Sequence, residues 1–199
     1  MPGQRALRRG QHLFWAGDPV TQIWTVQRGS LKTYRISGNG DERVNGFFFA
    51  GGVIGWEDLV CGFSQHHCIA LEPVTVVNDP IVSILDGALG SPQNQARLLD
   101  GIRTEFLRLE SILWLEHRTA EERLATFLLW LAASQPNGNG DARTVSLPMS
   151  RHDIGSYLGL ATETVSRRLT LFHRNGWITL SRRQLRINDV HRLQQIGEF

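Results

Sequence analysis

The first part of the chain, from about residue 10 to residue 85, is a series of short apolar runs separated by turn residues. Aromatic and β-branched residues dominate these runs, and glycine-rich stretches interrupt them. One run centres on Trp24 and Val26, a second on Phe47 and Phe48, and a third begins at Cys68. Strands this short, with turns this regular, predict a compact β-barrel or roll.

After Pro92 the apolar spacing changes to that of a helix. Two overlapping stripes, with steps of three and four residues, contain Leu98, Leu99, Ile102, Glu105, Phe106, Leu109, Ile112 and Leu113. A helix that is apolar over so wide an arc has more than one face to bury. We therefore predict a dimerisation helix over residues 91–118, which packs on the roll and on a second copy of the chain. A single internal core helix is the alternative.

The stretch from Met149 to Arg168 has the pattern of two helices joined by a glycine turn. Ser150 and Asp153 match a capping box at the start of the first helix, and Gly159 ends that helix. An apolar stripe marks the inward face of the second helix: Val165, Leu169 and Phe172. This pattern predicts a helix-turn-helix that presents its second helix to the major groove of DNA. An ordinary helical pair without DNA-binding function is the alternative.

Further predicted elements flank the helix-turn-helix on both sides. Residues 120–133 form an amphipathic helix pattern, and a polar, glycine-rich connection follows. Behind the second helix, residues 177–180 and 185–187 have the pattern of two strands, with Arg182 and Arg183 in the turn between them. We predict that this hairpin is a wing whose arginines reach the DNA backbone.

The charge is distributed unevenly along the chain. From Ala142 to Phe199 there are nine Lys and Arg against four Asp and Glu, a net charge of +5, whereas the remaining residues carry −3. Phosphate neutralisation by cationic side chains weakens as salt rises. A basic C-terminal third on a nearly neutral chain therefore favours DNA binding.

Side chains on and around the outward face of the second helix are the candidate DNA contacts. They are Arg151, Thr162, Glu163, Thr164, Ser166, Arg167, Arg168, Arg182 and Arg183. An arginine fork such as that of Arg167 matches guanine O6 and N7, and a carboxylate such as Glu163 accepts from the cytosine amino group. The alternative role for Glu163 is structural: a negative charge in the first turn interacts favourably with the helix dipole.

Composition excludes several other classes of protein. Hydrophobic residues make up 41% of the chain, and no apolar run approaches the roughly 18 residues of a membrane span. We expect a soluble cytoplasmic protein. Phosphate-loop, nucleophile-elbow and metalloprotease motifs are absent from the sequence, so we expect no enzyme, no metal site and no evident cofactor.

The two cysteines and the adjacent histidines are weak signals of a sensing site. We expect Cys61 and Cys68 to be free buried thiols, with a redox switch as the alternative. We expect His66 and His67 to form a polar turn before a strand at Ile69, since adjacent strand residues point to opposite faces and seldom share a metal.

The order of roll, long helix and winged helix-turn-helix resembles the cyclic-AMP receptor protein superfamily, over nearly the whole chain. Within it, the residues resemble the branch of the fumarate and nitrate reduction regulator (Crp/Fnr). The segments that carry this resemblance are residues 10–18, 40–42, 120–125, 153–160 and 163–167. It implies an α+β fold with a cyclic-nucleotide-binding-like roll at residues 1–90, a dimerisation helix at 91–118 and a winged helix-turn-helix at 119–199.

The same resemblance implies a homodimeric transcription regulator that contacts RNA polymerase and reads an inverted repeat of TTGAT-type half-sites. Glu163, Ser166 and Arg167 fall on the family's base-reading positions, and the turn at Gly40-Asp41 corresponds to its polymerase-activating hairpin. A simple tight turn is the alternative for Gly40-Asp41.

Two departures from the family affect the expected signal. Val77 aligns with the internal cysteine of the oxygen-sensing members, so we expect no iron–sulfur cluster unless the sequence is a truncated product. Residues 55–68 contain no arginine for a cyclic phosphate, whereas Glu57 and Asp58 would repel one. A roll that binds another small-molecule effector, or a thiol switch at Cys61 or Cys68, remains the alternative means of control.

Overall fold

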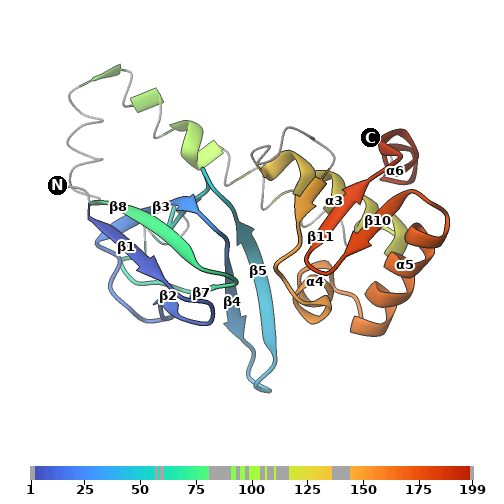
Figure 1. Cartoon of the computed structure of the whole chain (residues 1–199). Helices are drawn as coiled ribbons and strands as arrows, with labels where there is room; N and C mark the ends of the chain where they lie inside the picture. Colours follow the sequence, from blue (N-terminus) through green and yellow to red (C-terminus); the bar gives the residue numbers. More distant parts are fainter. Residues whose placement is uncertain are drawn as a thin grey trace. The chain divides into compact units, whose positions relative to one another are not determined.

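The computed structural model describes residues 3–56, 58, 61–80, 91–92, 95–96, 99–103, 106, 110, 117–135 and 144–197. It divides into two compact units, Met1–Ser111 and Ile112–Phe199. The first unit contains the roll and the second contains the helix-turn-helix (Figure 1).

The roll consists of two four-stranded antiparallel sheets, with strand orders β1-β8-β3-β6 and β2-β7-β4-β5. Its strands are β1 Gln4–Leu7, β2 His12–Phe14, β3 Gln22–Arg28, β4 Leu31–Ile36, β5 Glu42–Phe48, β6 Val53–Ile54, β7 His67–Ala70 and β8 Val74–Pro80. Inward residues from both sheets form one apolar core that includes Val26, Leu31, Ile54 and Val76, all at most 1% exposed. The short apolar runs therefore form the roll that the sequence predicts.

The described residues between Pro92 and Glu110 are helical. Leu99, Ile102 and Phe106 are 65%, 48% and 65% exposed, so these three apolar side chains have little cover within the described part of the chain. The other positions predicted for dimerisation, Leu98, Glu105, Leu109, Ile112 and Leu113, lie outside the described residues.

The segment before β7 differs from the sequence prediction. His67 is not in a turn but begins β7 and pairs with Tyr34 of β4. Its ring joins a cluster on one face of this sheet, stacked on Tyr34 at 4.9 Å between centroids, with Trp15 and His12 beside it. His66, which directly precedes β7, is instead buried near Asp58.

The cysteine prediction is half right. Cys68 is fully buried in the roll core, but Cys61 is exposed, and its sulfur accepts from the Gln65 side chain at 3.2 Å. Cys61 belongs to a turn outside the strands, so no sheet partner covers it.

The second unit packs helices on one small sheet. It contains α3 Ala120–Ser134, β9 Thr144–Ser146, α4 Arg151–Leu158, α5 Thr162–Arg174, β10 Ile178–Ser181, β11 Gln184–Ile187 and α6 Val190–Gly197. The sheet has the order β10-β11-β9. The predicted wing hairpin is β10 and β11, whereas β9 and α6 have no counterpart in the prediction.

A continuous core holds the second unit together. Leu128 and Leu131 of α3, Ile154 of α4, Phe172 of α5 and Leu185 of β11 are all essentially inaccessible to solvent. Helices α3 and α5 thus bury the apolar faces that their sequence spacing predicts. Among the described helices, none is both long and apolar enough to cross a bilayer.

Candidate DNA-binding interface

The first helix of the helix-turn-helix, α4, starts at a complete capping box. The Asp153 backbone N–H donates to Ser150 Oγ at 3.0 Å, and the Ser150 N–H donates to Asp153 Oδ2 at 2.8 Å. Asp153 is buried, and its carboxylate accepts from both the N–H and the hydroxyl group of Ser150. The capping box fixes where α4 begins, as the sequence predicts.

Two glycines shape the turn between α4 and α5. Gly159 has a φ of 65°, which is costly for residues with a side chain, and its N–H donates to the carbonyl of Gly155. A Cβ on Gly155 would lie 2.5 Å from the carbonyl oxygen of Leu160. The Leu160 N–H donates to the Gly155 carbonyl at 2.8 Å. The turn therefore packs directly on the backbone of α4, which sets where α5 begins.

Helix α5 separates an inward face from an outward face. Val165, Leu169 and Phe172 are at most 1% exposed, whereas Glu163 and Arg167 are exposed and Ser166 is half-buried. No side chain caps the N-terminus at Ala161, so its first N–H groups lack a side-chain acceptor. A negatively charged ligand is favoured at such an end.

The structure brings some of the predicted DNA contacts together and separates others. Glu163, Ser166 and Arg167 lie on the outward side of α5, with half-buried Thr162 and Thr164 at its start. Arg182 and Arg183 are exposed in the turn between β10 and β11.

Two predicted contacts have less open surroundings. Arg168 forms an ion pair with Glu121 of α3. Arg151 is half-buried at the first turn of α4, with its Nη1 atom covered, and burial lowers the pKa of its guanidinium from the usual range. The sequence pattern gave no sign of either environment.

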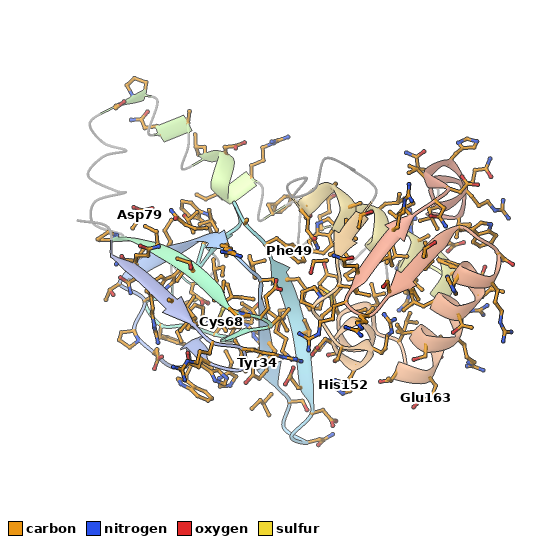
Figure 2. The ribbon with its side chains drawn as sticks, viewed as in Figure 1. Tyr34, Phe49, Cys68, Asp79, His152 and Glu163 are labelled. Atoms are coloured by element: carbon orange, nitrogen blue, oxygen red, sulfur yellow. The ribbon has the colours of Figure 1, made fainter. Side chains whose placement is uncertain are left out.

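His152 is an exposed residue at the start of α4 that was not among the predicted DNA contacts. It is exposed in the first turn of α4, beside the half-buried Arg151. Figure 2 shows His152 and Glu163 projecting from the same edge of the unit, at the first turns of α4 and α5.

A buried polar cluster shapes the loop of the roll before β7. Asp58 is 1% exposed, and its carboxylate accepts from Ser64 Oγ at 2.8 Å and from the Gln65 N–H at 3.1 Å. Burial by itself would raise the pKa of Asp58, but His66 and these two donors outweigh it, and the net pKa lies below the usual value. Asp58 is thus a charged carboxylate under ordinary conditions.

Comparisons with known proteins agree with these observations. A cyclic nucleotide-binding domain model matches residues 4–82, and a Crp-like helix-turn-helix domain model matches residues 122–196. Electron transport regulator A of Shewanella oneidensis is 35% identical over 196 residues, covering 98% of this chain and 78% of that protein. The fumarate and nitrate reduction regulatory protein of Escherichia coli is 32% identical over 203 residues, again covering 98% and 78%.

Comparison with solved structures identifies proteins of the same fold. FixK2 from Bradyrhizobium japonicum has a TM-score of 0.88 and 28% identity, over 98% of this chain and 97% of that one. The predicted fold class, with the roll first and the winged helix-turn-helix last, is confirmed. The chain belongs to the Crp/Fnr family of transcription regulators and carries its helix-turn-helix DNA-binding domain.

Proposed function

We propose that the chain is a homodimeric regulator that binds inverted repeats of TTGAT-type half-sites. The observation that carries this proposal is the two-sided character of α5. Its apolar stripe is sealed in the core, and Glu163, Ser166 and Arg167 are left on the outward side. Each subunit inserts one α5 into the major groove, and the distance between the two helices sets the half-site spacing.

Each of the three outward side chains has a distinct role. Arg167 donates its two parallel N–H groups to guanine O6 and N7, Glu163 accepts from a cytosine amino group, and Ser166 adapts to a neighbouring base or phosphate. Arg182 and Arg183 hold the DNA backbone from the wing without reading sequence. The uncapped start of α5 adds a favourable field for a phosphate.

The proposal also assigns the dimer contact and the polymerase contact. The apolar stripe with Leu99, Ile102 and Phe106 packs on the same stripe of a second copy. The β4–β5 hairpin contacts RNA polymerase through Gly40 and Asp41, which are both exposed at its tip. Gly40 has a φ of 86°, and the Ser37 N–H donates to the Asp41 carbonyl, so this tip is a closed, defined turn.

Selection from randomised duplexes, with and without reductant and air, tests the core of the proposal. We expect an inverted repeat of TTGAT-type half-sites. In anisotropy titrations, Arg167→Ala should flatten the preference at one guanine per half-site, a loss of about 1–3 kcal/mol of discrimination. Arg182→Ala should instead weaken specific and scrambled duplexes alike. Equal losses on both duplexes for Arg167→Ala would contradict its base-reading role.

A ligand-gated roll is the second candidate, favoured by a cavity of about 240 Å³ in the first unit. Leu13, Phe14 and Trp24 provide apolar walls, and Arg5 and Asp18 provide charge. Such a cavity suits a small effector rather than a nucleotide, and the charged Asp58 at its edge opposes a cyclic phosphate. Thermal-shift screening against small metabolites tests this candidate, since a gating ligand raises the melting temperature and changes DNA affinity.

A further inference from the structure

The first turn of α3 makes three different contacts from three consecutive residues. Glu122 completes a capping box with Thr119, whose N–H donates to the Glu122 carboxylate at 2.7 Å. Arg123 donates to the Leu158 carbonyl at 2.8 Å, at the end of α4. Glu121 pairs with Arg168 of α5. One turn of α3 therefore contacts both helices of the helix-turn-helix.

Arg167 and Arg168 are adjacent in sequence, but their side chains leave α5 in different directions. At 100° per residue, Arg167 lies about 160° from the buried Val165 around the helix axis, whereas Arg168 lies only about 60° from it. Arg168 thus leaves α5 along the flank that packs on α3, and its guanidinium reaches the Glu121 carboxylate. The two side chains of the pair are 40% and 37% exposed, so the pair sits at the rim of the α3–α5 contact.

We propose that Arg168 is a positioning residue, which fixes the angle of the recognition helix through Glu121 rather than by holding DNA. This inference rests on the proposed reading of bases by α5. Arg123 fixes the corner where α5 begins, and the Glu121–Arg168 pair restrains rotation of α5 nearly two turns further along the helix. Because a bidentate arginine–guanine contact demands alignment, a small rotation of α5 reduces specific binding more than non-specific binding.

Direct phosphate contact by Arg168 predicts a different pattern of effects. A lost phosphate contact lowers the affinity for every duplex and reduces the salt slope of log K by about 0.9 per contact, or about 1.8 for the two subunits of the proposed homodimer. Loss of a positioning pair lowers the ratio of specific to scrambled affinity and leaves the salt slope of the specific complex nearly unchanged. The ratio of specific to scrambled affinity is the useful quantity. Each charge change also alters long-range attraction to DNA, but this effect is the same for both duplexes and cancels in the ratio.

The test measures this ratio by anisotropy titration of the full chain at several salt concentrations, for wild type, Glu121→Gln, Arg168→Gln and their double variant. An exposed ion pair supports at most about a fivefold effect, so we expect each single variant to lower the ratio by about two- to fivefold. The double variant should lose no more than either single variant, since both remove the same interaction. The exchanged pair Glu121→Arg with Arg168→Glu should restore the ratio to within about twofold of wild type.

Arg182→Ala is the control for a backbone contact, with an expected lower salt slope and an unchanged ratio. The inference is overturned if Arg168→Gln shows that same pattern, or if the exchanged pair does not restore the ratio although thermal unfolding shows it folded. A wild-type protein without preference for the selected duplex would instead contradict the proposed function itself.

Discussion

The close packing of the α4–α5 turn on Gly155 leads to a quantitative prediction for Gly155→Ala. The added methyl group would lie 2.5 Å from the Leu160 carbonyl oxygen, whereas ordinary contact begins at 3.4 Å. The turn must therefore move by about 0.9 Å, and α5 begins two residues after it. Leu160 is also tied to Gly155 by its own hydrogen bond, which limits how it can move.

Two opposing energies decide the effect on stability. Alanine in place of glycine stabilises a helix by about 1 kcal/mol. Overpacking against a fixed group costs about 1–3 kcal/mol. We expect a net loss of about 1 kcal/mol, which lowers the melting temperature of a unit of this size by about 4–8 °C.

The effect on DNA binding should exceed the effect on stability. A displaced α5 misaligns the contact between Arg167 and guanine, which is worth about 1–3 kcal/mol, or about 5- to 150-fold in affinity. Thermal unfolding and anisotropy on the selected duplex measure the two effects separately. Gly38→Ala is the control, because a Cβ there meets open space. A Gly155→Ala protein that melts higher than wild type and binds DNA unchanged would refute the reasoning.

Three further predictions concern stability. Phe172→Ala removes a fully buried ring whose centroid lies 5.3 Å from that of Trp177, so the free energy of unfolding of the second unit should fall by about 3–5 kcal/mol. Denaturation followed by Trp177 fluorescence measures this loss, and a loss below about 1 kcal/mol would contradict the packing. Ser150→Ala removes the N-cap of α4 and should cost about 1 kcal/mol in denaturant titrations, with no loss arguing against the capping box. Burial, then the neighbouring His67, lowers the pKa of His12 below 6.5. The folded roll therefore takes up fewer protons than the unfolded chain, and its His12-dependent stability is present above pH 6.5 and lost as the pH falls through the His12 pKa. His12→Gln should weaken this pH dependence, and an identical pH profile would count against it.

The parts of the molecule that the sequence predicts correctly are those set by local spacing. The capping box at Ser150 and Asp153, the turn at Gly159 and the buried stripe of α5 are all encoded within a few residues of each other. The strands of the roll follow from the same short-range alternation and turn chemistry.

The parts that the sequence does not predict depend on contacts between distant segments. Arg168 meets a carboxylate 47 residues away. Helical periodicity places Arg168 on a different flank of α5 from Arg167, but it does not identify Glu121 as the partner. Strand β7 begins at His67, two residues before the predicted strand at Ile69, and His66 lies buried beside Asp58, a contact that the local sequence pattern does not show. Strand β9 is only three residues long and forms by pairing with β11, which lies far along the chain.

The wing turn has an unfavourable backbone conformation at a cationic residue. Arg182 has a φ of 46°, and it is the one non-glycine residue with a positive φ in the described part of the chain. A left-handed conformation costs an L-residue with a Cβ roughly 1–2 kcal/mol, whereas glycine adopts it readily. Folding stability alone would thus favour glycine at this tip. In the proposed function, the long cationic side chain of Arg182 holds the DNA backbone, so a glycine at this tip would raise thermal stability and lower DNA affinity.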